Sequence, residues 1–388
     1  MADAEAVAAI RYSDPWKLDL DQRMRMLARD ETSVAYFNEL ANDSTFRYRI
    51  YNMAQALNST GSDVSASYFF LADLHRLAEI ADIADLLVIC RTRYDHHVNH
   101  LVSAFRRRGK RVLFDVDDLV FDTDYVHLIM HTLDEDPSSE KVWDHWFAYL
   151  SRLGATLRLC DGAVTTNDYL AERIREYAPM PVTIVPNFIN REQLEISEPI
   201  FSMRQSMDIG GEGVIRLGYF SGSPSHNRDF AIVAPALEAL LEEDPRLRLV
   251  VAGYIDAGGA FRRFGVRVEQ HPFQDFVNLQ RLIGSVDFNL VPLQYNAFTN
   301  CKSQLKYFEA AIVGTLSIVS PTYTYSRAVH DGDNGYVSQA HQWAGCIRRA
   351  VAHLADYQTM AQRSCEDART KYAWFNQRAQ ILTALGIK

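Results

Sequence analysis

The sequence predicts an α/β protein made of two Rossmann-like halves of similar size that face each other across a cleft. Two observations carry this prediction. Short β-rich runs alternate with helical runs through two long stretches of chain, which is typical of parallel, doubly wound sheets. Between these stretches, residues 195–213 contain Pro199, several polar residues and three glycines (Gly210, Gly211 and Gly213), a composition that indicates a linker.

The elements of the first half follow a preceding segment, residues 1–30, that carries charge and few apolar residues. Helices are expected over 46–57, from the third strand to about residue 108, and over roughly 140–160. Strands are expected at residues 34–37, 67–71, 85–90, 111–114, 162–165 and 182–185. We therefore place an extension at 1–30 and a first domain at 31–205.

The same alternation restarts after the linker and defines a second domain over residues 206–369. Helices are expected over 229–243 and 275–283 and from about 341 to the end of the chain. Strands are expected at residues 215–220, 247–253, 266–269, 288–291 and 315–319. Ligands of such sheets bind at the carboxyl ends of the strands, so we expect the functional residues in the loops that follow them.

The composition restricts the class of protein. With 388 residues, 48% of them hydrophobic and 23% charged, the chain is long enough for two globular domains. A formal net charge of −9 argues against a general nucleic-acid binder. The five cysteines are scattered without a CxxC pair, which predicts neither a disulfide framework nor a zinc site and fits a reducing cytoplasm. No signal peptide or apolar window long enough for a transmembrane helix is found, so a cytoplasmic location is expected.

Residues 300–314 form the most informative stretch. Apolar residues recur at helical spacing, so we expect one helix with Lys302, Ser303 and Lys306 near its N-terminal end and Glu309 one turn further on. Free backbone N–H groups and nearby lysines favour an anion, and a carboxylate accepts hydrogen bonds from sugar hydroxyls. The stretch suits a nucleotide diphosphate. The alternative is a surface helix with ordinary charges.

A loop rich in small residues follows the first strand of the second half. It contains Gly222, Ser223 and His226 and ends near Arg228. Small residues let a backbone approach a phosphate closely, and an arginine pairs with it in a bidentate manner. The alternative is a plain strand-to-helix turn.

An acidic group follows the strand that ends near Phe114 in the first half. Asp115, Asp117 and Asp118 lie where the cleft is expected, and they suit a base, an acceptor of sugar hydroxyls or metal ligands. Helix capping with solvated charge is the alternative.

Two further clusters have simpler interpretations. The basic run at residues 106–111 ends a helix, where it complements the helix dipole; docking on anionic lipid headgroups is the alternative. His96, His97 and His100 lie close together, but no acidic or cysteine ligand is patterned with them, so no metal is expected.

Several motifs occur together in an order and spacing that resemble a known family. In the second half these are residues 216–222, 226–229, 249–253, 285–292, 309–314 and 331–335, and in the first half residues 160–167 and 185–189. The chain resembles retaining glycosyltransferases of the GT-B fold, of the family 4 type (glycosyl transferases group 1). The resemblance covers about 160–375 well and 33–160 loosely. It implies a terminal helix, residues 370–388, that crosses back onto the first domain.

The resemblance implies a nucleotide-sugar donor on the second domain. Arg228 would bind the diphosphate with Lys302 or Lys306, and Glu309 matches the second glutamate of the family's E-x7-E motif, which contacts the ribose. The first glutamate of that motif falls at Cys301. Asn300, Lys302 or Ser303 would replace it. Gly222, Ser223 and His226 complete the expected donor site.

The resemblance also implies an acceptor site on the first domain. Asp115 stands where such enzymes often carry a histidine, and Asp117 and Asp118 follow it. Arg47 and Arg49 occupy the region of the family's N-terminal Gly-Gly loop, which is missing here. Arg228 and Lys302 would stabilise the leaving diphosphate, and Asp115 or Asp117 would position the acceptor.

The resemblance implies a metal-independent enzyme that transfers a hexose-type sugar with retention. Its partners would be a nucleotide-diphosphate sugar as co-substrate, with no further cofactor, and a glycan or lipid-linked acceptor in bacterial surface polysaccharide synthesis. No nucleic acid is expected, and contact with the inner membrane would be peripheral. The alternatives are a GT-B nucleotide-sugar epimerase and a non-catalytic nucleotide-sugar-binding scaffold.

Overall fold

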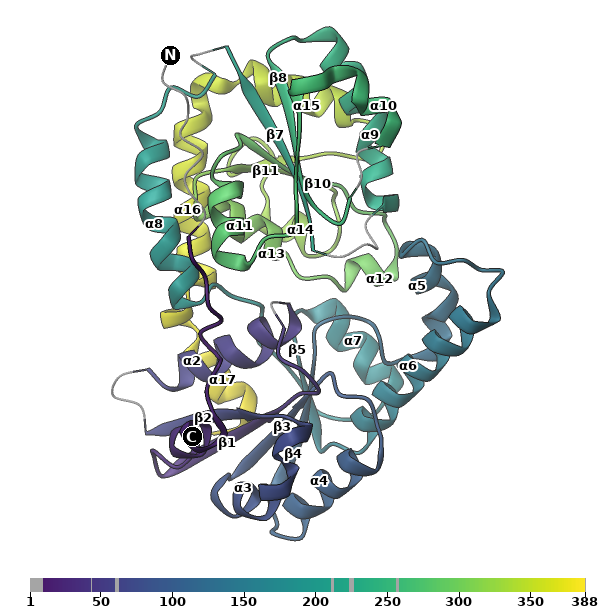
Figure 1. The fold of residues 1–388 in the computed structure, drawn as a ribbon, viewed down its shortest axis with the longest axis vertical. Helices are drawn as coiled ribbons and strands as arrows, with labels where there is room; N and C mark the ends of the chain where they lie inside the picture. Colours follow the sequence, from purple (N-terminus) through teal and green to yellow (C-terminus); the bar gives the residue numbers. More distant parts are fainter. Residues whose placement is uncertain are drawn as a thin grey trace.

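The computed structural model describes residues 10–42, 44–59, 63–210, 213–222, 227–255 and 258–387. They form two parallel sheets, one above the other in Figure 1, each covered by helices on both faces. Each sheet contains six strands. All the strand pairs within them are parallel, which confirms the predicted α/β class.

The first sheet has the strand order β2-β1-β3-β4-β5-β6. Its central strands are buried on both faces, as the continuous apolar run of β3 requires in a parallel sheet. The strands are β1 (Thr32–Phe37), β2 (Val64–Phe69), β3 (Leu86–Cys90), β4 (Arg111–Val116), β5 (Gly162–Thr165) and β6 (Val182–Ile184). The helices of this half are α1 (Leu20–Leu27), η1 (Arg47–Tyr51), α2 (Asn52–Leu57), η2 (Leu71–Arg76), α3 (Leu77–Ile83), α4 (His96–Arg106), η3 (Thr123–Tyr125), α5 (Val126–Thr132), α6 (Glu140–Arg158) and α7 (Asp168–Tyr177). Helix α8 (Arg191–Gln205) begins at the first half and runs along the second, where Arg204 donates to the carbonyls of Gly284 and Gly314 (Figure 1).

The second sheet has the strand order β12-β11-β10-β7-β8-β9. Its strands are β7 (Ile215–Ser221), β8 (Leu247–Gly253), β9 (Val268–His271), β10 (Phe288–Val291), β11 (Leu316–Val319) and β12 (Tyr336–Val337). Its helices are α9 (Asn227–Glu243), α10 (Gly258–Phe261), η5 (Arg262–Arg267), α11 (Phe276–Ile283), α12 (Ala297–Asn300), α13 (Leu305–Ala311), α14 (Tyr325–Ala328), α15 (Trp343–Ala352), η6 (Leu354–Asp356) and α16 (Tyr357–Tyr372), and the chain ends with η7 (Trp374–Asn376) and α17 (Arg378–Leu385).

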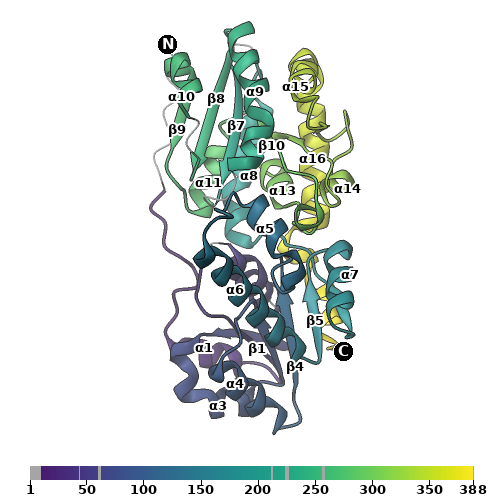
Figure 2. The ribbon, with the colours of Figure 1, turned by 90° about the vertical axis from the view of Figure 1, so that its right-hand side faces the viewer.

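The last part of the chain returns to the first half. The long helix α16 runs from the second half towards the first, and α17 lies beside the first sheet (Figures 1 and 2). Thr183 donates a hydrogen bond to the carbonyl of Ala384 at 3.1 Å, and Arg111 donates to the carbonyl of Leu385 at 2.5 Å. Helix α17 therefore packs against the first half, and Lys388 lies outside the described residues.

The described part of the N-terminal extension bridges the two halves. The backbone of Ile10 makes two hydrogen bonds with the side chain of Asn278 in α11, at 3.0 and 3.1 Å. The Trp16 ring packs against Phe276 of α11 on one side and against Phe46 of the first half on the other. We call residues 10–16 the N-terminal strap; it runs down one side of the molecule in both views (Figures 1 and 2).

Two expected elements differ from the structure. Residues 195–205, expected in a linker, belong to helix α8, which contains Pro199 in its second half. The expected helix over 300–314 is two short helices: α12 ends at Asn300, and α13 begins only at Leu305. Asn296 starts α12 with a capping box, and residues 301–304, which include Lys302 and Ser303, connect the two helices.

Candidate functional site

A cleft of about 690 Å³ lies between the carboxyl ends of the two sheets. From the first half, Arg91 follows β3 and Asp117 follows β4. From the second half, Gly222 follows β7, and Gly253 ends β8. Gly253 has a φ of 96°, and a side chain there would collide with the carbonyl oxygen of Ser221, so this edge of the cleft requires glycine. The cleft occupies the position where parallel α/β sheets bind ligands.

The second half contributes two lysines and a hydroxyl to the cleft. Lys302, Ser303 and Lys306 all line it. Ser303 is 8% exposed, and no hydrogen-bond partner for its hydroxyl is present in the described chain. A buried hydroxyl without a partner costs free energy, so a ligand oxygen at this point would be stabilising.

The pKa of Lys306 is lowered by its surroundings. Protein atoms surround its ammonium, which stands 5.3 Å from the centre of the Tyr219 ring, although the side chain keeps some exposure. Desolvation, opposed by the nearby Asp229 carboxylate and reinforced by Lys302, lowers the pKa of Lys306 to about 8. A bound anion would remove this penalty.

Glu309 lies at the junction of the two halves and is 4% exposed. Its Oε1 accepts hydrogen bonds from the Tyr48 hydroxyl, from Gln193 at 3.1 Å and from Arg47 at 3.4 Å. Among the described residues no donor reaches its Oε2. One oxygen thus fixes the carboxylate, and the other is left to accept a ligand hydroxyl.

A polar cluster of the first half faces this anion site across the cleft. Arg91 Nη1 donates to Asp117 Oδ1 at 2.9 Å and to Asp118 Oδ2 at 3.0 Å. The Thr45 hydroxyl donates to the second oxygen of Asp117 at 3.1 Å. The backbone of Arg91 has a φ of 39°, a left-handed conformation that is uncommon outside glycine. The cluster holds two carboxylates and an arginine in one geometry.

Asp115 and Arg49 do not line the cleft, which corrects their expected place in the acceptor site. Strand β4 runs to Val116, so Asp115 lies inside the sheet rather than after it. Both its oxygens accept hydrogen bonds from Arg49, at 2.7 and 2.9 Å, and both side chains are at most 1% exposed. Burial, opposed by Arg49, raises the pKa of Asp115 to about 6. Asp117, two residues further along, reaches the cleft because each strand residue advances the chain by roughly 3.3 Å.

Two predicted donor residues, Arg228 and Asn300, do not line the cleft. Arg228 is paired with Asp134, from the loop after α5, at 2.7 Å across the two halves. Asn300 accepts a hydrogen bond from the backbone of Tyr323 at 2.9 Å, and Cys301 is fully buried against the first-half core. Cys301 therefore does not offer a ligand contact in place of a glutamate. Gly222 lines the cleft, whereas Ser223 and His226 lie outside the described residues.

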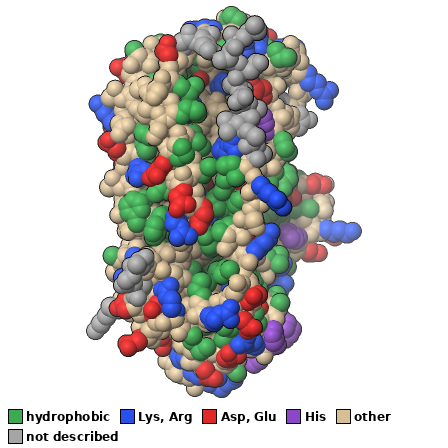
Figure 3. All heavy atoms as spheres, turned by 60° about the vertical axis from the view of Figure 1, so that its left-hand side comes forward, with side chains coloured by type: hydrophobic (Ala, Val, Ile, Leu, Met, Phe, Trp, Pro, Cys, Tyr) green, Lys and Arg blue, Asp and Glu red, His purple; other side chains and the backbone are tan. Residues whose placement is uncertain are grey.

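The basic run at residues 106–111 and the histidine cluster near the start of α4 both lie outside the cleft. In the basic run, Arg106 pairs with Asp161 and Arg108 with Asp82, and Lys110 donates to two helix-end carbonyls. Acidic and basic side chains are interspersed on the face drawn in Figure 3. Asp95, His96 and His97 bring ligand-type atoms within 4.8 Å of one another at the start of α4, outside the cleft. Within the described ranges, no helix is long and apolar enough to cross a bilayer.

Sequence reasoning missed four residues of the cleft region: Arg91, Tyr48, Gln193 and Trp146. Arg91 follows β3 directly, so the rule that pointed to Asp117 also pointed to it. Gln193 and Tyr48 sit within helical segments and gain their role only through the tertiary contact with Glu309.

Comparison with known proteins supports the fold. No family model and no curated protein matches the chain. A sucrose-phosphate synthase from Thermosynechococcus elongatus matches 90% of this chain and 96% of its own, at 14% identity and a TM-score of 0.60. HepE from Anabaena, in complex with UDP and glucose, matches 91% and 99%, at 13% identity and 0.60. A glycosyltransferase from Rickettsia africae matches 92% and 98%, at 11% identity and 0.61.

Coverage of nearly the whole of both chains means that the two sheets and their mutual arrangement are shared. The chain has the GT-B fold, two Rossmann-like domains that face each other across a cleft, as the sequence predicts.

Proposed function

We propose that this protein is a glycosyltransferase that takes a sugar from a nucleotide-diphosphate donor. The observation that carries the proposal is the convergence of Lys302, Lys306 and the unpartnered Ser303 hydroxyl on one wall of the cleft. Two cations beside a buried donor match the two charges of a diphosphate. The likeness to HepE, whose structure holds UDP and glucose, supports the same assignment.

The donor would lie along the second half. Lys302 and Lys306 would hold the diphosphate, and Glu309 would accept the ribose hydroxyls through Oε2 while Oε1 stays bound to Tyr48 and Gln193. Gly222, directly after β7, would let the donor phosphates come close to its backbone. It has no side chain, and no protein atom fills the space within 4 Å of where a Cβ would stand. Arg228 would join the diphosphate only after leaving Asp134.

The chemistry we propose is electrostatic. As the bond between the sugar and the diphosphate breaks, negative charge grows on the phosphate oxygens, and fixed cations beside them lower the barrier. For a transfer with retention, the acceptor hydroxyl attacks from the face that the diphosphate leaves, and the leaving phosphate takes its proton. Asp117 is suited to orient that hydroxyl, since it lines the opposite wall. We propose a glycan or lipid-linked glycan, of the kind used in bacterial surface polysaccharides, as the acceptor.

The test is a binding screen followed by product analysis. Thermal shift against UDP-, GDP-, ADP- and dTDP-sugars should give a rise in melting temperature with one nucleotide family, by mass action. Isothermal titration should then show affinity reduced about tenfold or more in Lys302→Ala and in Lys306→Ala, since each removes a charge-assisted contact. Lys141→Ala, an exposed lysine on α6 that does not line the cleft, is the matched control.

The outcomes separate the possible functions. Absence of binding by all four families, or equal affinity in the lysine variants and the wild type, would overturn the donor site. Conversion of the donor to an epimer or free sugar would indicate an epimerase. A donor that binds tightly and never turns over would favour a binding scaffold. This alternative is supported by the ion pairs of Arg228 with Asp134 and of Glu309 with Arg47, which occupy two residues expected to act on the donor.

A further inference from the structure

Building on the transferase function proposed above, we propose that the acceptor group entering the cleft is an uncharged, hydroxyl-bearing moiety and not a sugar phosphate. The wall formed by the first half carries two arginines, Arg47 and Arg91, and both are bound to carboxylates that also face the cleft. The wall therefore presents hydrogen-bond acceptors rather than an available positive charge.

Arg91 is fixed on several sides. Its Nη1 is shared between Asp117, Asp118 and the Thr45 hydroxyl, and its Nε donates to the Tyr149 hydroxyl at 3.3 Å. A guanidinium held in this way has little capacity left for a phosphate, because its charge is already balanced by two carboxylates within 3.0 Å. Arg91 is therefore a positioning residue that fixes the two aspartates.

Arg47 is fixed in a similar way. It is 4% exposed, contacts Glu309 and Gln193, and its guanidinium carbon lies 4.1 Å from the centre of the Tyr48 ring and 4.7 Å from that of Phe276. A cation sandwiched by aromatic rings and hydrogen-bonded to a carboxylate does not turn towards a new anion without losing these contacts.

The charges that the first half contributes to this wall balance. Asp117 and Asp118 offset Arg47 and Arg91, and Glu309, which binds Arg47, belongs to α13 of the second half. The two positive lysines lie on the opposite wall, where the donor diphosphate is proposed to bind. A phosphate on the acceptor would therefore meet no excess positive charge on this wall, and it would lie beside the carboxylates of Asp117 and Asp118, which repel it.

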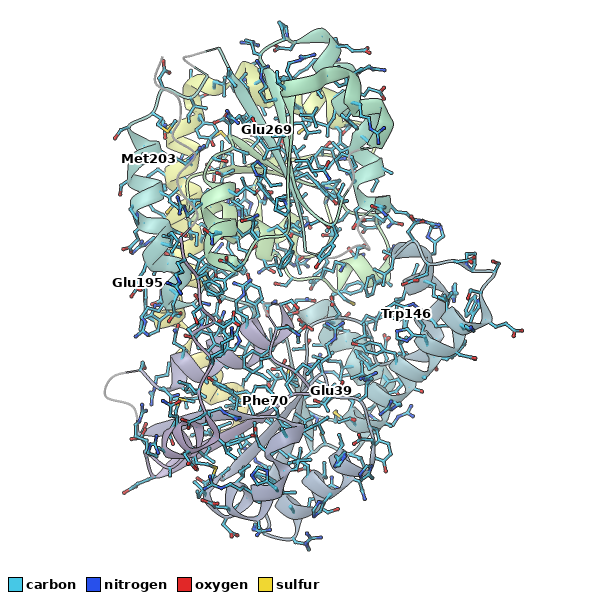
Figure 4. The ribbon with its side chains drawn as sticks, in the orientation of Figure 1. Glu39, Phe70, Trp146, Glu195, Met203 and Glu269 are labelled. Carbon is cyan, nitrogen blue, oxygen red and sulfur yellow. The ribbon has the colours of Figure 1, made fainter. Side chains whose placement is uncertain are left out.

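The same wall suits a sugar hydroxyl. Ionised carboxylates only accept hydrogen bonds, so Asp117 and Asp118 can each receive one from an acceptor hydroxyl. Trp146 of α6, labelled in Figure 4, lines the cleft beside them and offers an apolar ring. Its indole N–H is buried and has no partner in the part of the chain that the structure describes. An aromatic surface with a few convergent polar groups is the usual composition of a small-molecule site.

The charge assignment can be tested without any transfer activity. In a Lys302→Ala/Lys306→Ala background, which removes the two lysines of the cleft, inorganic phosphate is titrated into the full-length protein by calorimetry. We expect no saturable binding. Adding Asp117→Asn and Asp118→Asn should produce saturable phosphate binding, about tenfold or more above the detection limit of the background titration, because Arg91 then lacks a charged partner.

The matched control is Glu39→Gln. Glu39 makes an equivalent ion pair with Arg93 at 2.7 Å, close in sequence to Arg91 but outside the cleft, and it is labelled in Figure 4. Glu39→Gln in the lysine-free background should therefore not produce phosphate binding. Phosphate binding in the lysine-free background that disappears in Arg91→Gln would overturn the inference, as would an absence of gain in the aspartate variants. Asp118→Asn alone serves if the double change fails to fold by circular dichroism.

A second arm uses the acceptor itself. With the nucleotide sugar found in the binding screen, methyl glycosides and the same sugars bearing a 6-phosphate are offered as acceptors. Transfer should favour the neutral glycosides, and preference for the phosphates would overturn the inference. Loss of transfer to every acceptor, combined with the expected phosphate titration, would instead count against the transferase function and leave the charge assignment standing.

Discussion

Binding of the nucleotide sugar should weaken as the pH rises through 8, because Lys306 loses its proton there. Desolvation lowers the pKa of this lysine from its ordinary value to about 8 in the free protein. Below pH 8 the ammonium is already charged, and binding needs no further proton. Above pH 8 the diphosphate must draw a proton onto Lys306, and the free energy of that protonation is subtracted from the free energy of binding.

The size of the effect follows from the pKa. With a value of 8, the protonated fraction of Lys306 falls about tenfold between pH 7 and pH 9, so the dissociation constant should rise about tenfold, or ~1.4 kcal/mol. The nucleotide sugar is a better probe than the free nucleotide, since its doubly esterified diphosphate has no proton to lose in this range. Calorimetry in two buffers of different ionisation enthalpy also measures the protons taken up.

The variant Lys306→Arg provides the control. An arginine keeps its charge across this range, so its dissociation constant should stay level from pH 7 to 9. A level curve for the wild type would refute the reasoning. An equal rise in both proteins would assign the titration to another group.

Three further predictions concern the surroundings of the cleft. Arg49→Met should destabilise the fold by about 3–5 kcal/mol in urea unfolding, whereas Arg49→Met with Asp115→Leu should restore most of that loss, because the single change leaves a buried charge unpaired; equal losses would contradict the structural role of the pair. Trp16→Ala should cost about 3–5 kcal/mol by the same measurement, since it removes ring contacts to Phe46 and Phe276; a cost near zero would mean that the strap is not bound in solution. Asp134→Asn should tighten nucleotide-sugar binding and Arg228→Gln should weaken it, because the first frees Arg228 and the second removes it; shifts of the same sign would exclude Arg228 from the donor site.

The strands could be predicted because their signal is local. A run such as Leu86–Cys90 is apolar throughout and is bounded by polar residues, so burial on both faces follows from composition alone. The same rule placed Asp117, Lys302 and Lys306 near the cleft, since each follows a strand of its sheet. The prediction of a single helix over 300–314 is wrong. The apolar residues at helical spacing begin at Leu305, where α13 starts, and the residues before it form a connection that the spacing does not reveal.

The role of an ion pair could not be predicted, since it depends on residues far apart in the sequence. Asp115 and Asp117 look equivalent in the chain. They differ because Arg49 of η1 forms an ion pair with the first inside the protein, whereas the second pairs with Arg91 at the cleft. Arg228 likewise looks available until Asp134 from the first half is placed beside it.

The N-terminal strap and α17 set an order of assembly. The strap rests on Asn278 and Phe276, which are synthesised some 260 residues later, and α17, which follows both sheets in the chain, packs on the first half. During synthesis the strap therefore lacks its partners until α11 has been made, and the first half lacks α17 until both sheets have been made. We expect that neither half can be cut out as an independently folding unit, because each would lose these contacts.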